Sequence, residues 1–400
     1  MHRVHKIKLE PNNLQATYFA RASGVARFAY NWALAEWKKE YEAGGKPSEA
    51  ALRKKLNGIK KEQFPWMAEV TKVAPQNAIK NVGVAFQNFF RRVKQGGKPG
   101  YPRFKQKGLH DSFRADNGPQ DANSNAVECV GKTIKLARCG VVKMAEPLRF
   151  EGRTLAATVS KQAGGWYVAI LVETNDCLSG SLHRGVVGVD LGIKSLATLS
   201  TGEVIPALKA HRAAHSRLVR LSRCLSRKKK GSRNRAKAKA KLARLHQRIA
   251  NVRTDALHKL THKLATEFDT VAIEDLNVRG MLRNHSLARS IADSGFAEFR
   301  RQLEYKAAMT GAKVFVVDRF FPSSKTCSIC GTIHEMKLSD RVMVCGCGNV
   351  VDRDLNAATN LRNKAVSSTV SACGEGSSDG GCKTAVKLPS VKQEVSFEHA

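Results

Sequence analysis

Apolar and polar residues alternate at the start of the chain, and the period then becomes that of a helix. Residues 4–9, Val-His-Lys-Ile-Lys-Leu, alternate apolar and basic side chains, which predicts a strand with one buried face. Apolar residues recur at three- and four-residue spacing from Ala22 to Ala33 and again across 74–94, which predicts two helices. The sequence Gly-Gly-Lys-Pro-Gly at 96–100 ends the second helix.

Short strand-like runs follow over residues 109–178, and Thr133–Leu136 and Trp166–Val172 are the clearest of them. We therefore interpret residues 1–178 as a small β domain with a helical insertion. Two separate small domains are the alternative interpretation.

A second unit begins near Gly185, where the pattern changes to buried strands between helices. The predicted elements are strands at 186–190, 271–274 and 314–317, a hairpin across 198–205, and helices at 206–268, 292–310 and 354–364. Such alternation indicates an α/β layer structure. From about Val366 the sequence is rich in Ser, Gly and Lys, which predicts a disordered tail whose Cys373 and Cys382 are incidental thiols.

Length and charge narrow the choice of partner. A chain of 400 residues exceeds what one core usually serves, and its 68 Lys and Arg against 34 Asp and Glu give a net charge of +34. Nucleic acid is the usual partner of such an excess, through phosphate contacts. An anionic membrane surface is the weaker alternative, because the longest apolar runs are too short to span a bilayer. No signal-peptide pattern stands at the N-terminus, so we expect a cytoplasmic protein.

The strongest charge run lies inside the long predicted helix. Between Arg227 and Arg253 there are twelve Lys and Arg and no Asp or Glu, beside an apolar seam at Leu242, Leu245, Ile249 and Val252. Solvated helices normally mix both signs, so a single-sign run favours contact with a polyanion over a merely solvated face. The candidate nucleic-acid contacts are Lys228, Lys229, Lys230, Arg233, Arg235, Lys237, Lys241, Arg244 and Arg248.

Four of the ten cysteines are clustered. Cys327 and Cys330 form a C-x-x-C-G turn, and Cys345 and Cys347 follow with a shorter C-x-C spacing. Two such turns on a short hairpin supply the four thiolates of a structural zinc site. His334 is a substitute ligand in principle, but we favour a solvent-facing side chain for it.

Three carboxylates stand where strands end or a helix begins: Asp190 after Val-Val-Gly-Val, Glu274 after Val-Ala-Ile, and Asp354 before Leu-Asn-Ala-Ala. Carboxylate oxygens converging in this way would suit Mg²⁺, and RNase H-like nucleases use two such ions on the scissile phosphate. An acid at a strand end is more often a turn or cap residue. The order of the three acids relative to the basic helix and the cysteine cluster makes the set specific.

With these motifs the chain resembles the TnpB family, insertion-sequence-encoded RNA-guided DNA endonucleases related to the type V CRISPR effectors. The resemblance covers about residues 1–365. It rests on the motifs Tyr-Pro-Arg-Phe at 101–104, Gly-Val-Asp-Leu-Gly-Ile-Lys at 188–194, Leu-Ser-Arg-Lys-Lys-Lys-Gly at 225–231, Ile-Glu-Asp-Leu at 273–276, Arg-Gln-Leu-Glu-Tyr-Lys-Ala at 301–307, Phe-Pro-Ser-Ser-Lys-Thr-Cys at 321–327 and Asp-Arg-Asp-Leu-Asn-Ala-Ala at 352–358.

The resemblance implies an α/β RNase H-like (RuvC-type) nuclease domain with a zinc-ribbon insertion, and a β-barrel wedge domain with an inserted helical recognition domain. The implied boundaries are 1–12 and 109–178 for the wedge domain, 13–108 for the recognition insertion, 179–325 and 349–365 for the nuclease, 326–348 for the zinc insertion and 366–400 for the tail. It further implies a catalytic, magnesium-binding triad of Asp190, Glu274 and Asp354 with two Mg²⁺, and one structural zinc.

The implied partners are a noncoding guide RNA and double-stranded DNA beside a short target-adjacent motif, bound by a monomer. Lys72, Gln76 and Asn77 match a region that reads such motifs, and a helix cap or surface role is equally compatible. A compact type V CRISPR effector and a nuclease-inactive RNA-guided repressor are the alternatives. The repressor is disfavoured because all three acids are present.

Overall fold

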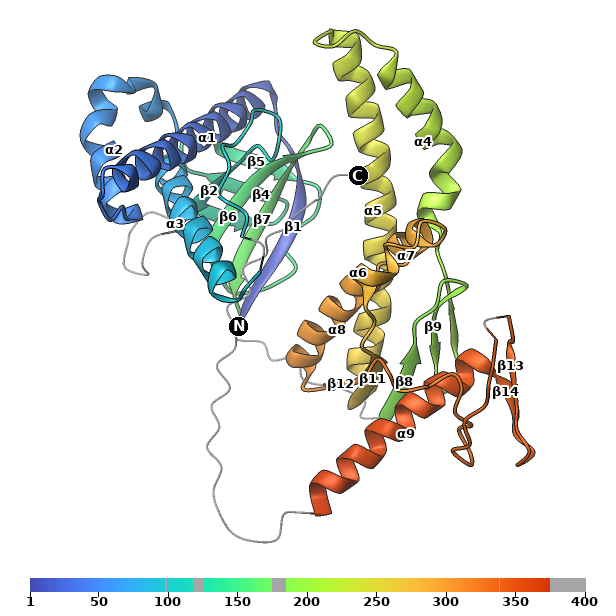
Figure 1. Cartoon of the computed structure of the whole chain (residues 1–400). Coiled ribbons are helices and arrows are strands. Elements are labelled where there is room, and N and C mark those ends of the chain that lie inside the picture. Colours follow the sequence, from blue (N-terminus) through green and yellow to red (C-terminus); the bar gives the residue numbers. More distant parts are fainter. Residues whose placement is uncertain (98, 118–125, 175–184, 338, 375–400) are drawn as a thin grey trace. The chain divides into compact units, whose positions relative to one another are not determined.

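The structure is a computed structural model that describes residues 1–97, 99–117, 126–174, 185–337 and 339–374. The chain divides into two compact units, residues 1–180 with 209–257 and residues 181–208 with 258–400 (Figure 1). This division groups residues 209–257 with the first unit, whereas the expected domain boundaries put them in the nuclease. Each unit is described by itself below.

The first unit is built on a seven-stranded antiparallel sheet in the order β2-β6-β7-β1-β5-β4-β3. Its strands are β1 His2–Glu10, β2 Ser112–Asp116, β3 Val127–Val130, β4 Thr133–Leu136, β5 Gly140–Met144, β6 Arg153–Gln162 and β7 Gly165–Glu173. The buried face of β1 alternates as its sequence predicts. Asn117, next after edge strand β2, exchanges hydrogen bonds with Val127 of the opposite edge strand at 2.8 and 2.7 Å. The sheet thus curls until its two edges meet at this asparagine.

Three helices cover this sheet: α1 Asn13–Glu42, α2 Glu49–Gln63 and α3 Val73–Lys94, with a short 3-10 turn at Pro65–Glu69 (Figure 1). The predicted helices across 22–33 and 74–94 are confirmed as parts of α1 and α3. Helix α2, whose buried side chains are Leu52 and Leu56, was not predicted. One apolar cluster joins the helices to the sheet, and Phe19 at its centre packs edge-on against Trp166 of β7.

The prediction of one long helix over 206–268 is wrong in one respect, because this segment forms two helices that pack as a hairpin. Helix α4, Ala210–Ser226, and helix α5, Arg233–Glu267, pack through Leu218, Leu245 and Ile249. Gly231 lies between them with φ +82°, a conformation that favours glycine. Val252, expected in the apolar seam, is 42% exposed, so the seam ends before it.

The second unit holds a five-stranded sheet in the order β10-β9-β8-β11-β12. The strands are β8 Val186–Asp190, β9 Ser195–Leu199, β10 Val204–Pro206, β11 Thr270–Glu274 and β12 Lys313–Val317, and β8, β11 and β12 run parallel. Its helices are α6 Val278–Met281, α7 Ala288–Ser294, α8 Phe296–Thr310 and α9 Arg353–Gly374 (Figure 1). The mixed sheet with helices agrees with the predicted α/β layer structure.

Two helix boundaries differ from the predictions. The helix expected at 292–310 is divided at Gly295, whose φ of +71° interrupts it between α7 and α8. Helix α9 continues to Gly374, eight residues beyond Val366, so the first part of the predicted tail is helical, and residues 375–400 lie outside the described part. In the described ranges, no helix combines the length and apolarity needed to cross a bilayer.

Candidate active site and nucleic-acid interface

Two of the three predicted carboxylates end neighbouring parallel strands. Strands β8 and β11 pair in register up to Val189 and Ile273, so Asp190 and Glu274 are the next residues on each strand. Both side chains are partly buried at the carboxyl edge of the sheet. This edge is where α/β sheets usually place their ligands.

The third carboxylate, Asp354, is brought to this edge by helix α9, which lies against β8. Gly188 of β8 makes the close approach possible, because a Cβ there would lie 1.9 Å from the carbonyl oxygen of Ala358 and 2.7 Å from the amide of Arg362. The backbone of Asp354 is fixed by Asp352, whose Oδ1 accepts hydrogen bonds from the amides of Asp354 and Leu355 at 2.9 and 3.2 Å. Asp352 is therefore a helix cap.

The three carboxylates interact electrostatically. Burial, followed by the negative charges of Glu274 and Asp354, raises the pKa of Asp190 from 3.8 to about 7. The positive charge of Arg353 opposes this shift but does not cancel it. The negative charges of Asp190, Glu274 and Asp354 are therefore concentrated at this edge of the sheet, where they disfavour the ionised form of Asp190. Carboxylate oxygens are the donors that a hard divalent cation prefers, so the chemistry of these three side chains fits such an ion.

The structure adds residues that sequence reasoning missed around Glu274. The hydroxyl of Ser323 donates a hydrogen bond to Glu274 Oε1, and the backbone oxygen of Ser323 accepts one from the buried amide of Asn360 at 2.7 Å. Asn356, one turn earlier on α9, donates to the carbonyl of Thr326 at 2.7 Å. The same helix that carries Asp354 therefore also positions the partner of Glu274. Ser323 lies within a quoted motif, which was the available signal.

Asp275, the residue after Glu274, does not share the hydrogen-bond partner of Glu274. It accepts hydrogen bonds from Arg300, at 2.7 Å, and from Arg319, and these bonds hold its pKa below the usual range. A cavity of about 240 Å³ opens beside Glu274, with Arg300 and Arg301 among its lining residues. Arg300 is paired with Asp275 and Glu304 at 2.7 and 2.8 Å, and Arg301 with Glu298 at 2.7 Å.

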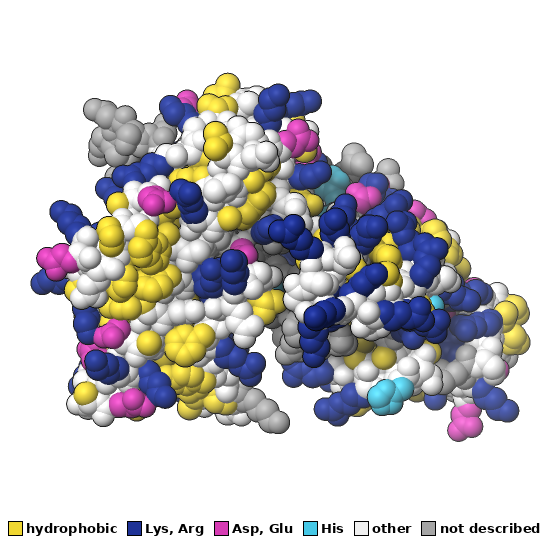
Figure 2. Space-filling view, turned by 90° about the horizontal axis from the view of Figure 1, so that it is seen from above, with side chains coloured by type: hydrophobic (Ala, Val, Ile, Leu, Met, Phe, Trp, Pro, Cys, Tyr) yellow, Lys and Arg dark blue, Asp and Glu magenta, His cyan; other side chains and the backbone are white. Residues whose placement is uncertain are grey.

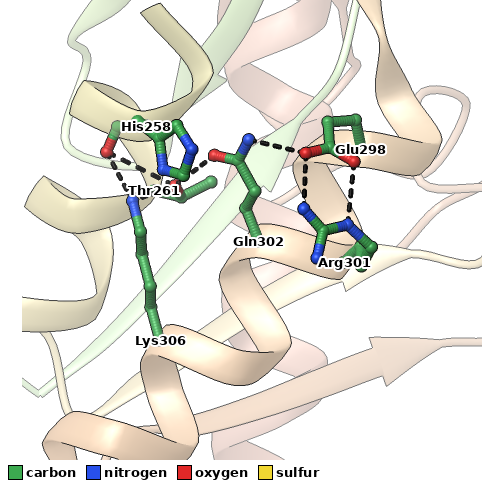
Figure 3. Close-up of polar contacts among 6 residues, drawn as sticks. All are labelled: His258, Thr261, Glu298, Arg301, Gln302 and Lys306. Atoms are coloured by element: carbon green, nitrogen blue, oxygen red, sulfur yellow. Dashed lines mark hydrogen bonds and ion pairs between the residues drawn. The ribbon is translucent and has the colours of Figure 1, made fainter. Parts of the chain in front are cut away.

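Helix α8, which carries these arginines, is held by a polar network with Thr261 and Gln302 at its buried centre (Figure 3). Lys306 donates to the carbonyl of His258 at 2.6 Å and to the hydroxyl of Thr261 at 2.8 Å, and Gln302 joins Thr261 to Glu298. Burial lowers the pKa of Lys306 to about 8. The motif at 301–307 therefore fixes α8 against the end of α5, which explains its polar residues structurally.

The four clustered cysteines converge as the spacing predicts. Their Sγ atoms all lie within 4.8 Å of one another, with Cys327 and Cys347 at 3.7 Å and Cys330 and Cys345 at 3.4 Å. Four thiolates at about 2.3 Å from a tetrahedral zinc lie roughly 3.8 Å apart, so the set fits the ion. Hydrogen bonds from the amide of Cys330 and the side chain of Asn349 lower the pKa of Cys327, whereas burial and the neighbouring thiols raise the pKa of Cys345.

The surroundings of the cysteine cluster also agree with two knuckles. The glycine after each pair, Gly331 or Gly348, has a positive φ of +77° or +90°. Strands β13 Val342–Val344 and β14 Val350–Asp352 form the hairpin that carries the second pair. His334 is partly buried instead of facing solvent, and it is outside the group of four ligand atoms.

We expect Cys327→Ser to release zinc and to destabilise the second unit, because binding of a structural metal contributes folding free energy. Elemental analysis should find about one zinc per wild-type chain and a clear loss in the variant. Cys224→Ser, at an exposed cysteine of α4, is the control and should keep the metal. A folded wild-type protein without zinc would contradict the assignment.

The predicted basic helix presents a cationic face. Lys237, Lys241, Arg244 and Arg248 of α5 are exposed and lie beside the seam that packs on α4. Arg235 has a different role, because it donates at 3.0 Å to the carbonyls of Leu225 and Lys228 and so closes the turn between the helices. Lys228, Lys229 and Lys230 lie exposed in that turn, and Arg233 is exposed at the start of α5.

Helix α4 adds cations that were not singled out from the sequence. Arg220, Arg223 and Arg227 recur every three or four residues and line a hollow of about 490 Å³. The same single-sign pattern that marked α5 could have identified them, since α4 holds no Asp or Glu. The hairpin therefore presents cations from both helices.

Changing Lys237, Lys241, Arg244 and Arg248 together to Gln should weaken nucleic-acid binding and reduce its salt dependence by about one unit of slope per lost phosphate contact. The four side chains are exposed, and like charges four residues apart repel each other, so their removal should not lower the stability of α5. Titrations at several salt concentrations measure the slope. Lys38→Gln, which removes a cation paired with Glu42, should leave the slope unchanged. An unchanged slope in the fourfold variant would mean that this face is merely solvated.

The three candidate motif readers lie at the start of α3. Lys72 is exposed and precedes the helix, and Gln76 is partly buried. The amide of Asn77 donates to Asp116 of β2 at 2.7 Å, so it ties α3 to the sheet. The structural role of Asn77 is thus visible, while base contacts by the three residues stay a prediction.

Models of known families match three parts of the chain. The family OrfB_IS605, described as "Probable transposase", matches residues 169–285, and the Cas12f1-like TNB domain matches residues 296–361. A model described as "Helix-turn-helix domain" matches residues 1–46, where the structure instead has strand β1 and the single long helix α1.

Relatives extend over nearly the whole chain. A protein of Streptomyces pristinaespiralis named "Putative RNA-guided DNA endonuclease" is 37% identical, over 98% of this chain and 96% of its own. A protein of Escherichia coli (strain K12) named "Putative RNA-guided DNA endonuclease InsQ" is 32% identical, over 93% and 94%. A solved chain from the Cas12f1-sgRNA-target DNA complex aligns with a TM-score of 0.55 at 15% identity, over 87% of this chain and 82% of that chain, which is a likeness of fold.

Proposed function

The chain belongs to the OrfB_IS605 (TnpB) family, and from this premise we propose that it is a transposon-encoded RNA-guided DNA endonuclease. Its substrate in this proposal is double-stranded DNA next to a short target-adjacent motif. The reaction is hydrolysis of phosphodiester bonds in a RuvC-type, RNase H-like domain. The guide is a noncoding RNA held by the protein.

The observation that carries the proposal is the convergence of Asp190, Glu274 and Asp354 at one edge of the second sheet. The raised pKa of Asp190 supports a cation site, because three carboxylates with too little countercharge are a suitable donor set for Mg²⁺. These three residues would hold the ions. When bound, divalent ions activate water and stabilise the leaving oxygen in such hydrolyses.

The protein's own side chains orient the site. Ser323 fixes Glu274 Oε1, and Asn360 fixes Ser323, so the carboxylate is held by α9 rather than left to rotate. Arg300 and Arg319 hold the neighbouring Asp275 by hydrogen bonds, which keeps that carboxylate with its own partners. The cysteine cluster would keep a structural zinc beside the same helix, because Ser328 in its first turn donates to Asn356 of α9 at 3.0 Å.

Two other functions weigh less. A nuclease-inactive RNA-guided repressor would not need three coupled carboxylates, and this chain keeps all of them. A compact type V CRISPR effector would share the chemistry and differ in the source of the guide. The cationic hairpin fits either RNA source, so the chemistry is the same in both cases.

The protein should purify with a structured RNA, because its net charge of +34 needs a polyanion to offset it. Absorbance ratios and gels of preparations made at low salt measure the bound nucleic acid, and sequencing identifies it. A preparation carrying only heterogeneous cellular RNA, with no enriched species, would contradict the guide assignment.

A further inference from the structure

A second single-sign run lies in the first unit, between Glu69 and Asp111. Residues 70–110 contain no Asp or Glu, and they combine basic with aromatic residues. The cations are Lys72, Lys80, Arg91, Arg92, Lys94, Lys98, Arg103, Lys105 and Lys107, and the aromatic residues are Phe86, Phe89, Phe90, Tyr101 and Phe104. The proposed function does not use this run, apart from the separate prediction for Lys72.

Four aromatic rings of this run, those of Phe86, Phe89, Phe90 and Tyr101, form one connected group. Phe86 is buried and stacks on Trp37 with ring centroids 4.4 Å apart, which anchors the group in the core. Tyr101 meets Phe86 and Phe89 edge-on at 5.6 and 5.7 Å. Phe90 touches Phe89 at 5.3 Å. The rings are therefore held by one another and by the core.

Two rings of this group face solvent, as does the ring of Phe104, three residues after Tyr101 in the sequence. Phe90, Tyr101 and Phe104 are 51, 50 and 59% exposed, which is unusual for three large aromatic side chains so close in sequence. Space-filling Figure 2 shows how apolar side chains gather in patches on the surface with Lys and Arg beside them. In the run itself every charged side chain is a cation.

The segment that carries Tyr101 and Phe104 is fixed to helix α1. Asn31 donates to the carbonyl of Lys105 at 3.0 Å and accepts from its amide at 2.7 Å. The ammonium group of Lys105 lies 4.4 Å from the centre of the Tyr30 ring. Two backbone hydrogen bonds to one side chain hold an otherwise irregular segment, so the rings are presented in a defined place.

Rings flanked by cations, without acids, match the chemistry of unpaired nucleotides. Bases stack on exposed aromatic rings whatever their identity, and cations neutralise the phosphates between them. Aromatic rings that stayed exposed to solvent would promote aggregation. A partner that remains bound and covers the rings is therefore favoured over one that binds only transiently. In the proposed function the resident partner is the guide RNA.

We propose that Phe90, Tyr101 and Phe104, with the basic residues around them, form a stacking platform for unpaired nucleotides of the guide RNA. This inference rests on the proposed function for the identity of the RNA. Stacking is not electrostatic, so the three rings contribute affinity without contributing to the salt dependence of binding, which comes from the basic residues.

The test measures binding of the full-length protein, freed of nucleic acid, to an oligouridylate at several salt concentrations. Tyr101→Ala and Phe104→Ala should each weaken binding by roughly tenfold with an unchanged salt slope. Tyr101→Phe should restore most of the affinity, because it keeps the ring. Leu14→Ala, at an apolar side chain that is 82% exposed on α1, is the control and should bind as the wild type does.

Wild-type affinity in both alanine variants, with an unchanged melting temperature, would overturn the platform. So would a loss confined to the matching oligodeoxynucleotide, since the site would then serve DNA. Unchanged affinity in variants of a protein that still cuts guided DNA contradicts the platform and leaves the proposed function standing. Ring-dependent RNA binding in a protein that cuts no DNA contradicts the function and leaves the platform standing.

Discussion

Gly188→Ala is expected to abolish DNA cleavage and to lower the free energy of unfolding of the second unit by about 3 kcal/mol. The added Cβ would lie 1.9 Å from the carbonyl oxygen of Ala358, so helix α9 must move away from β8. That helix carries Asp354 and the asparagine that holds Ser323. The substitution would thus disturb two of the three carboxylates without touching either. Denaturant unfolding and cleavage assays measure the two effects.

The matched control is Gly58→Ala, in the middle of α2. An added Cβ there meets nothing within 4 Å, so the change should stabilise the helix slightly or have no effect. If Gly188→Ala cuts DNA at the wild-type rate, α9 does not need its close approach to β8 to place Asp354, and the account of the site is wrong.

Asp190→Asn is expected to abolish cleavage while leaving RNA and DNA binding within a few-fold of wild type. Affinity comes from cations and base pairing, whereas the carboxylate serves the metal site. Glu274→Gln and Asp354→Asn should behave alike, and combining the substitutions should add little, because a metal site fails as a unit. Glu203→Gln, at an exposed ion pair with Lys263, is the control that should cut normally.

The same variant should be more stable than the wild type when metal is removed. The pKa of Asp190 is raised from 3.8 to about 7 in the folded chain, so the folded state resists its ionisation. Stability of the metal-free wild type relative to Asp190→Asn should therefore fall between about pH 4 and pH 7 and stay constant above pH 7. The difference has an upper bound of roughly 4 kcal/mol, at about 1.36 kcal/mol per pKa unit.

Thermal melting of both proteins with and without Mg²⁺ measures how the ion changes the stability of the wild type relative to Asp190→Asn. Added Mg²⁺ should raise the melting temperature of the wild type but not of Asp190→Asn, because an ion that binds the folded state stabilises it by mass action. An equal rise in both proteins would place the ion elsewhere.

Local patterns predicted the elements whose periodicity was strong. The alternation in β1 and the apolar runs of β8, β11 and β12 are confirmed, since buried strands show themselves in the sequence. The division between α4 and α5 was missed although residues 226–232, Ser-Arg-Lys-Lys-Lys-Gly-Ser, hold no apolar side chain and include Gly231, whose φ of +82° favours a turn. Helix α2 was missed because it buries just Leu52 and Leu56.

The candidate site was predicted only in part. Asp190, Glu274 and Asp354 could be chosen because each stands at an element boundary, and their order along the chain matched a family. Ser323 and Asn360 could not, because their hydrogen bonds join residues 49 and 37 positions apart. Arg235 was predicted to contact nucleic acid, yet it also closes a turn, which a charge pattern does not reveal.

The most direct test of the central claim is cleavage by the purified protein bound to its copurified RNA. Linear double-stranded DNA that matches the guide segment beside the target-adjacent motif should be cut in the presence of Mg²⁺. DNA with a scrambled match should stay intact, and replacing the guide segment should redirect cleavage to the new match. Cutting that ignores the guide sequence, or no cutting of matched DNA by a folded complex with its zinc, would contradict an RNA-guided endonuclease.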